Sequence, residues 1–225
     1  MPLPTLAIIG GTGALGGGLA ARWAKAGYAV IIGSRTPEKA ARAVAAIEAG
    51  TGAPPVRGMG NAEAATAGDI VIVAVPYASH AAILGQIAAS VQGKIVVDAT
   101  VPLVPPKVGT VNLPEQGSAA EAAQAALGTG VEVVSALHNV AADKLSKDAP
   151  IDCDVLVCGD AKAARAAVIA LVGALGLRGL DAGPLANSAA AEALTSVLIT
   201  INRRYKVDGA GIRITGDLVD GEDGG

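Results

Sequence analysis

The stretch that decides the fold lies near the start of the chain, where residues 6–16 read LAIIGGTGALG. Its first four residues are continuously apolar, which is typical of a strand buried on both faces of a parallel sheet. Gly11, Gly13 and Gly16 form a G-x-G-x-x-G motif, and the Ala-rich run after it predicts a helix to about residue 26. A strand, a Gly-rich turn and a helix in this order favour dinucleotide binding, with phosphates at the helix amino terminus.

Each glycine of the motif has an expected purpose. Gly11 is expected to permit the tight turn, Gly13 to let a pyrophosphate approach the backbone, and Gly16 to let helix and strand pack closely. Gly17 and Gly18 follow directly, although a glycine inside a helix costs up to about 1 kcal/mol. We expect these two glycines to allow close packing of the helix against the sheet.

Short apolar segments alternate with longer Ala-rich segments along most of the chain. The expected strands are residues 6–9, 29–32, 69–75, 94–98, 132–136 and 154–157. Helix starts are indicated at Thr36 before Pro37, at Ser118 with Glu121 three residues later, and at Asp160. The pattern predicts an α/β fold: a Rossmann-like, doubly wound, mostly parallel sheet with a small C-terminal extension.

The length of 225 residues suits one domain plus an extension, at about 150 residues per domain. We expect a dinucleotide-binding, Rossmann-like domain over residues 1–150 and a smaller part over residues 151–216 that completes the sheet. A flexible acidic tail is expected over residues 217–225. Residues 184–202 predict a long apolar helix, which could form the interface of a homodimer.

The composition excludes several classes of protein. Apolar residues make up 52% and charged residues 16% of the chain, which excludes intrinsic disorder. A net charge of −3 and the scarcity of aromatic residues argue against nucleic-acid or membrane-surface binding. Residues 1–21 and 70–93 carry no charge, but glycines in the first and polar residues in the second argue against a signal peptide or membrane span. We therefore expect a soluble, cytoplasmic protein.

The two cysteines, Cys153 and Cys158, lie in one expected strand, with Cα atoms about 16 Å apart. This exceeds the reach of a disulfide, about 7 Å, so we expect two reduced and mostly buried thiols. The only histidines of the sequence are His80 and His138, and no spacing typical of a metal site is present. We expect no metal.

The end of the second expected strand indicates which dinucleotide binds. An NAD enzyme places an Asp or Glu there for the ribose 2′-hydroxyl, but this chain has Ser34 and Arg35, with Lys39 one turn further on. A carboxylate would repel a 2′-phosphate, whereas a guanidinium can bind it through charge-assisted hydrogen bonds. The sequence therefore predicts NADP. The alternative is that Arg35 and Lys39 are ordinary solvated surface charges.

The blocks quoted so far, together with several later ones, resemble a known family, the NADP-dependent oxidoreductases of coenzyme F420, an 8-hydroxy-5-deazaflavin. The resemblance spans nearly the whole chain, and the later blocks are more specific than the glycine motif. The similar blocks are residues 9–16, 33–35 with Lys39, 134–138, 157–160, 180–185 and 211–214.

The resemblance implies binding residues for two cofactors, NADP and coenzyme F420. The pyrophosphate would lie on residues 12–15, that is Thr12, Gly13, Ala14 and Leu15, and the 2′-phosphate on Ser34, Arg35 and Lys39. Pro76, Tyr77 and Ala136 would flank the nicotinamide, and the segment around Ala210 and Gly211 would enclose the deazaflavin. The family often carries a Trp after that Pro and a His close behind. Here Tyr77 follows and His80 is offset, so we expect His80, like His138, to be structural.

The resemblance implies an oxidoreductase that moves a hydride directly between two stacked rings, which is mainly a positioning problem. It needs no metal and no catalytic acid or base, in keeping with a chain that shows no acid–base constellation. Two alternatives stay open: an NADP-dependent reductase of a small keto acid or imine, and a non-catalytic NADP-sensing module. The cations near the end of the chain either attract the anionic tail of the deazaflavin or are a solvated helix end; they are Arg203, Arg204, Lys206 and Arg213.

Overall fold

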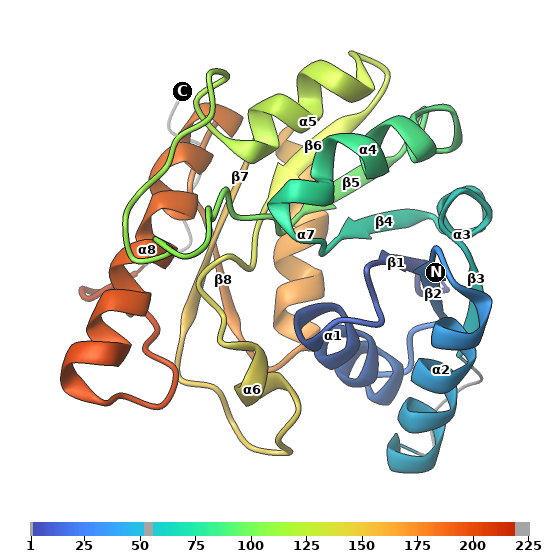
Figure 1. The fold of residues 1–225 in the computed structure, drawn as a ribbon, viewed down its shortest axis with the longest axis horizontal. Helices are drawn as coiled ribbons and strands as arrows, with labels where there is room; N and C mark the ends of the chain where they lie inside the picture. Colours follow the sequence, from blue (N-terminus) through green and yellow to red (C-terminus); the bar gives the residue numbers. More distant parts are fainter. Residues whose placement is uncertain (1, 52–55, 219–225) are drawn as a thin grey trace.

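The computed structural model describes residues 2–51 and 56–218, so most of the predicted acidic tail lies outside the described residues. One sheet runs through the molecule in the order β3-β2-β1-β4-β5-β6-β7-β8 (Figure 1). Neighbouring strands are parallel except β6 and β7, which are antiparallel. The strands are β1 (Leu6–Ile9), β2 (Val30–Ser34), β3 (Arg57–Gly60), β4 (Ile70–Val73), β5 (Ile95–Asp98), β6 (Glu132–Ser135), β7 (Asp154–Gly159) and β8 (Arg178–Asp181).

The order of the strands reverses at β1, because the chain adds β2 and β3 on one side and β4 on the other. Such a reversal leaves a crevice at the carboxyl ends of the two central strands, where ligands of doubly wound folds bind. All six expected strands are present, with ends that differ by at most two residues. Two strands, β3 and β8, were not expected, because both are edge strands, contain glycine and are only partly buried.

Helices cover both faces of the sheet (Figure 1). Side chains alternate along β1, so that Leu6 and Ile8 enter one apolar core while Ala7 and Ile9 enter the other. The first core includes side chains of α1 and α7, and the second those of α4 and α5. The helices are α1 (Ala14–Lys25), α2 (Pro37–Thr51), α3 (Asn61–Ala67), α4 (Tyr77–Ile87), α5 (Ala119–Leu127), α6 (Ala142–Leu145), α7 (Lys162–Ala174) and α8 (Ser188–Tyr205).

Two of the three predicted helix starts are present in the structure, and the third is not. Pro37 begins α2, and the Ser118 hydroxyl caps α5 by accepting a hydrogen bond from the Glu121 N–H at 2.9 Å. The prediction for Asp160 is wrong, because α7 begins at Lys162 and the Asp160 carboxylate instead accepts the Leu185 N–H at 2.9 Å. Asp160 thus joins the end of β7 to the 3₁₀ turn Leu185–Asn187 that precedes α8.

The helix α1 is tied to distant parts of the chain by two adjacent side chains. The Trp23 side chain is buried and donates through Nε1 to the Leu171 carbonyl of α7 at 2.9 Å. The Arg22 guanidinium donates to five backbone carbonyls, those of Lys144, Leu145, Lys147, Ala149 and Leu175. These bonds fix α1, and therefore the turn from which it starts, against α6 and α7.

Gly18 packs against α6 and not against the sheet as expected: a Cβ there would lie 2.7 Å from the Leu145 Cβ. The predicted long helix is α8, which begins at Ser188 and carries a buried carboxylate, Glu192. Both cysteines carry free, buried thiols. Over the described ranges, no helix combines the length and the apolar character that crossing a membrane requires.

Candidate functional site

The reversal of strand order leaves a cavity of about 170 Å³ at the carboxyl ends of β1 and β4, here called the dinucleotide crevice. It is formed by the Gly-rich turn after β1, the end of β2 with the start of α2, and the segment between β4 and α4. Of the predicted site residues, six line it: Thr12, Gly13, Ser34, Arg35, Lys39 and Pro76. Gly11 and Gly16 are buried beneath the turn, while Ala14 is exposed and Leu15 half-buried at the start of α1.

The Gly-rich turn holds the chain in a conformation that favours glycine at one position. Gly10 has φ +88°, and a Cβ there would lie 2.3 Å from the Ala74 carbonyl oxygen of the neighbouring segment. The tight turn therefore depends on Gly10, one residue before the expected Gly11. Gly16 fulfils its expected role, since a Cβ there would lie 2.6 Å from the Gly10 carbonyl oxygen.

The start of α1 is open to an anion. Its first helical bond runs from the Gly17 N–H to the Gly13 carbonyl at 2.8 Å, so the N–H groups of residues 14–16 have no partner within the helix. The N-cap residue, Gly13, has no side chain to cap them, and the first turn contains no acidic residue. The helix dipole adds about half a positive charge at this end, so the turn is suited to hold a pyrophosphate.

The other end of the crevice is cationic. Arg35 and Lys39 are exposed where β2 ends and α2 begins. The Ser34 hydroxyl accepts the Thr36 N–H at 3.1 Å, which leaves its own hydrogen free to donate. No Asp or Glu is among the described residues that line the crevice. This arrangement suits the 2′-phosphate of NADP and lacks the carboxylate that would bind the 2′-hydroxyl of NAD.

Tyr77 and His80 lie in the first turn of α4, beside the crevice, and His80 does more than start that helix. Its Nε2 lies 2.6 Å from the Oδ2 atom of Asp98, the last residue of β5, and both side chains are buried. The other Asp98 oxygen accepts the Thr100 N–H at 2.8 Å. The His80 ring stacks on Tyr77, with centroids 6.2 Å apart and planes at 30°. Asp98 thus orients His80, and His80 supports the predicted nicotinamide neighbour Tyr77.

The His80–Asp98 pair was missed by sequence reasoning, because its members are 18 positions apart and belong to different elements. The available indication was an acidic residue at the end of a buried strand. Around it, three buried polar atoms have no hydrogen-bond partner within the described part of the chain: Thr100 Oγ1, Ser135 Oγ and His138 Nε2. Ser135 is the last residue of β6, and Thr100 and His138 follow the carboxyl ends of β5 and β6. Because buried polar atoms normally have partners, they mark positions where a bound molecule could donate or accept.

Glu192 of α8 is a second buried titratable group in this region. It accepts the N–H groups of Ala119 at 2.7 Å and Ala120 at 3.0 Å, at the start of α5. Burial nevertheless raises the pKa of Glu192 to about 7. Burial also lowers the pKa of His138 to about 4, so this ring is neutral near pH 7.

The unfolding free energy is expected to fall by about 2 kcal/mol between pH 5 and pH 8 through Glu192 alone. Its pKa in the folded chain lies above the value of an exposed Glu, so the unfolded state loses its proton first and stability decreases as the pH rises. Urea unfolding of the unchanged chain and of Glu192→Gln across this range measures the effect as the difference between the two curves. His138 titrates equally in both proteins and cancels. Parallel curves would contradict the assignment.

Ala210 and Gly211 line a different cavity of about 210 Å³, here called the strap cavity. It lies between the segment after β6, the segment before β7, and residues 209–211. It lies on the same side of the sheet as the crevice, because β7 runs antiparallel to β6, pairs with it through Cys158 and Gly159 only, and therefore starts beyond the carboxyl end of β6. Among the described residues, none lines both cavities. Ala136, the remaining predicted residue, is fully buried at the end of β6, so its place beside a nicotinamide stays a prediction.

The four cations near the end of the chain are not alike. Arg203 and Arg204 are exposed in the last turn of α8, and Lys206 follows with φ +53°. Arg213 is instead paired with Asp152 at 3.0 Å and with Asp154 at 3.6 Å. Of these four cations, Arg213 is therefore the one that forms ion pairs with acidic side chains of the described residues.

A larger groove of about 620 Å³ runs along α1, between α2, α6 and the end of α7. Gly17, Gly18 and Ala21 line it, so the absence of large side chains on α1 helps to form it. Its cations have other partners: Arg22 binds backbone carbonyls, and Lys25 pairs with Asp148 at 2.7 Å. Over residues 2–51 and 56–218, His, Cys, Asp and Glu side chains form no group of three or more that could hold a metal ion.

Comparisons of the sequence with known proteins identify one family. The family model described as "NADP oxidoreductase coenzyme F420-dependent" matches residues 5–102. The F420-dependent NADP reductase of Methanocaldococcus jannaschii is 41% identical over 93% of this chain and 97% of its own length. That of Methanothermobacter thermautotrophicus is 38% identical over 93% and 94%. A crystal structure assigned to an F420-dependent NADP reductase of Arthrobacter sp. FB24 superposes with TM-score 0.80 and 27% identity, covering 95% of this chain and 100% of that one.

Proposed function

The chain belongs to the F420-dependent NADP reductase family, and on that premise we propose that it transfers a hydride directly between NADP(H) and coenzyme F420. The observation that carries the proposal is the dinucleotide crevice, with free N–H groups at one end, cations at the other, and no carboxylate among its described lining residues. Family membership does not favour the two alternatives, a keto-acid or imine reductase and a sensing module.

The two ends of the crevice suit the two charged parts of NADP. The turn residues Thr12, Gly13, Ala14 and Leu15 hold the pyrophosphate, with the free N–H groups at the start of α1 as donors, and Ser34, Arg35 and Lys39 hold the 2′-phosphate. Both sets of residues belong to elements that the sheet fixes, so this half of the site is formed before the dinucleotide arrives. We assign this half to residues 1–150.

The reaction itself requires two stacked rings with their reacting carbons about 3–3.5 Å apart. The reduced nicotinamide supplies the hydride, and the deazaflavin accepts it at a ring carbon. The chain's own contribution is to orient the rings and exclude water. Pro76, Tyr77 and Ala136 flank the nicotinamide, while Ala210 and Gly211, in the part over residues 151–216, enclose the deazaflavin. The His80–Asp98 pair keeps Tyr77 in place.

A single absorbance experiment separates the three functions. The purified chain is mixed with NADPH and the deazaflavin, and the visible absorbance of the deazaflavin is followed. Bleaching of the deazaflavin together with loss of NADPH supports the proposal. Loss of NADPH only with a keto acid or an imine supports the small-substrate reductase. Binding of NADPH without any turnover supports the sensing module.

We further propose that the chain works in the cytoplasm as a homodimer, with α8 in the interface. Val197 of α8 is 46% exposed, and Val111 and Leu113 are 44% and 52% exposed. The segment before them lies along α8, since Ser196 Oγ donates to the Thr110 carbonyl and Thr200 Oγ1 to the Gly109 carbonyl. These apolar side chains suit a second copy of the same surface.

Val197→Asp is expected to convert the dimer to a monomer, because it places a charge in an apolar interface. Sedimentation velocity at one fixed concentration measures the change. Leu3→Asp serves as the control, since Leu3 is also about half exposed but precedes β1. An unchanged sedimentation coefficient for Val197→Asp would place the interface elsewhere.

A further inference from the structure

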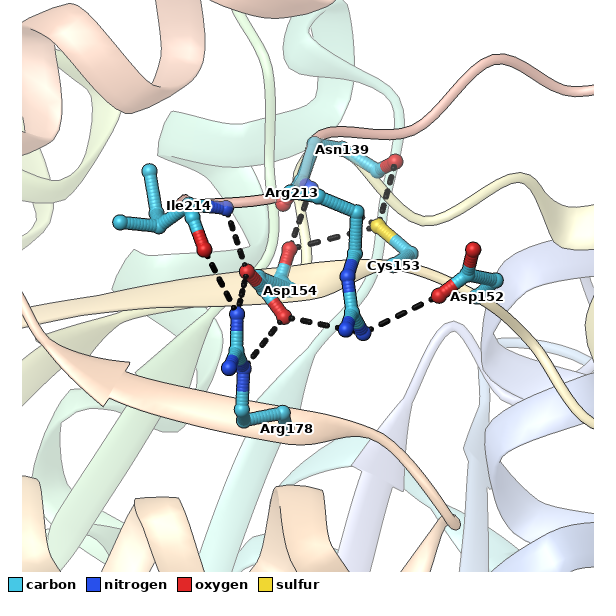
Figure 2. A network of polar contacts seen from close by, with 7 residues as sticks. All are labelled: Asn139, Asp152, Cys153, Asp154, Arg178, Arg213 and Ile214. Atoms are coloured by element: carbon cyan, nitrogen blue, oxygen red, sulfur yellow. Dashed lines mark hydrogen bonds and ion pairs between the residues drawn. The ribbon is translucent and has the colours of Figure 1, made fainter. Parts of the chain in front are cut away.

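A buried carboxylate fastens the segment that lines the strap cavity. Asp154 is the first residue of β7 and is completely buried. One of its oxygens accepts from Arg178 Nε at 2.7 Å and the other accepts the Ile214 N–H at 2.6 Å. Figure 2 shows Asp154 between Arg178 on one side and the last segment of the chain on the other. We call residues 209–214 the C-terminal strap.

Backbone and guanidinium bonds complete the attachment at this end of the strap. The Asp154 N–H donates to the Ile212 carbonyl at 2.8 Å, and Arg178 Nη2 donates to the Ile214 carbonyl at 3.0 Å. Arg213 approaches the same carboxylate at 3.6 Å and pairs with Asp152 (Figure 2). Asp154 and Arg178 thus bind the strap on both sides of Arg213, and the Arg178 guanidinium holds the pKa of Asp154 below its usual range.

The other end of the strap is fastened to α8 and packs closely on Cys153. The Ala210 N–H donates to Asn202 Oδ1 at 2.7 Å. A Cβ on Gly211 would lie 2.8 Å from Cys153 Sγ, so the strap lies directly on the residue before Asp154. Across the cavity, Asn139 Nδ2 donates to the Asp154 carbonyl at 2.7 Å (Figure 2). Asp154 therefore bonds both to the strap and to Asn139, which lines the strap cavity on the other side.

The energetics favour a positioning role over a purely stabilising one. A buried ion pair adds little net stability, because desolvation offsets its attraction, but it fixes the geometry of the groups that it bonds. The groups fixed here are Ile212 and Ile214, which follow the cavity-lining Ala210 and Gly211 directly. None of these residues lines the dinucleotide crevice.

We propose that Asp154 is a positioning residue for the second substrate: by holding the C-terminal strap, it sets the affinity for the deazaflavin without affecting that for NADP. The inference rests on the proposed function, because it takes the strap cavity as the place of the deazaflavin. In Asp154→Asn, one carboxylate oxygen becomes an NH2 group, which cannot accept the hydrogen bond that Arg178 or the Ile214 N–H donates there, and the strap loosens.

Steady-state kinetics test the proposal in the intact chain. For Asp154→Asn, the KM for the deazaflavin is expected to rise about tenfold, the effect of weakening one hydrogen bond to a charged group. The KM for NADPH is expected to stay within about twofold. Amide hydrogen exchange should increase in residues 209–214 and remain unchanged in the Gly-rich turn.

Asp181→Asn is the matched control. Asp181 also pairs with an arginine, Arg165, whose Nε lies at 2.7 Å, but Asp181 is exposed and lies at the opposite end of β8 from Arg178. It should leave both KM values unchanged. An equal rise in both KM values for Asp154→Asn, or no rise in either, would overturn the proposal, as would a rise for Asp181→Asn as large as that for Asp154→Asn.

Two further variants keep the test decisive if Asp154→Asn does not fold. Arg178→Lys keeps the charge but loses the forked bonding, and should raise the deazaflavin KM by about threefold. Gly211→Ala pushes the strap from Cys153 and should raise the same constant without altering any charge. Normal deazaflavin KM values in both variants would overturn the proposal. Failure of the proposed function can be distinguished from failure of the Asp154 proposal, because the unchanged chain would then not reduce the deazaflavin at all.

Discussion

The Ser34→Glu variant is expected to use NADPH about 100-fold less efficiently than the unchanged chain, measured as kcat/KM. The new carboxylate would face the 2′-phosphate at the end of β2, and juxtaposed like charges cost several kcal/mol. A Glu at this position also accepts hydrogen bonds from a free ribose 2′-hydroxyl, so kcat/KM for NADH should stay level or rise. The preference for NADPH over NADH therefore falls by at least the same factor.

Ser146→Glu is the control for this experiment. Ser146 is exposed and bonds locally, to the Asp143 carbonyl, as Ser34 bonds to Thr36, but it lies outside the crevice. The added charge is the same, so any general effect of net charge appears in both variants. If Ser34→Glu leaves the ratio of the two efficiencies unchanged, Arg35 and Lys39 are solvated surface charges and the crevice does not distinguish the coenzymes.

Gly10→Ala is expected to lower the free energy of unfolding by about 3 kcal/mol and to abolish dinucleotide binding. The positive φ of Gly10 costs an alanine about 1–2 kcal/mol, and the overlap of its Cβ with the Ala74 carbonyl oxygen adds about 1–3 kcal/mol. The melting temperature should fall by roughly 6–12 °C for a chain of this size. Calorimetry with and without NADP measures both effects.

Gly27→Ala separates the two causes. Gly27 has φ +92°, nearly the same as Gly10, but a Cβ there would meet no atom of the described residues within 4 Å. Its substitution should therefore cost only the conformational strain and leave NADP binding intact. Equal decreases in the free energy of unfolding of the two variants would mean that the close approach of Gly10 to Ala74 does not contribute to the effect.

The sequence predicts the architecture well because the motifs that indicate it each consist of residues close together in the chain. The apolar run before the Gly-rich turn, and Ser34 with Arg35 at the end of β2, each lie within a few positions of one another. β3 and β8 were missed because edge strands need no continuous apolar run. Gly11 was preferred to Gly10 because the motif does not show which glycine has positive φ.

The buried polar pairs could not be predicted in the same way. Asp98 meets His80 across 18 positions, and Asp154 meets Arg178 across 24. No periodicity relates such residues, since the sheet order brings them together only after the strands have paired. For Asp160 the local sequence is misleading. It suits a helix cap, but the Asp160 carboxylate accepts a hydrogen bond from the N–H of Leu185, 25 positions away.

The position of Trp23 gives the molecule a built-in optical probe. It is the only Trp of the sequence, and no Phe and three Tyr accompany it. It lies nine residues along α1 from the first helical residue after the Gly-rich turn, or about 14 Å at helical rise. Indole emission overlaps the absorption band of a reduced nicotinamide, so energy transfer from this one fluorophore would report occupancy of the crevice without any label. The same emission would shift when α1 separates from α7.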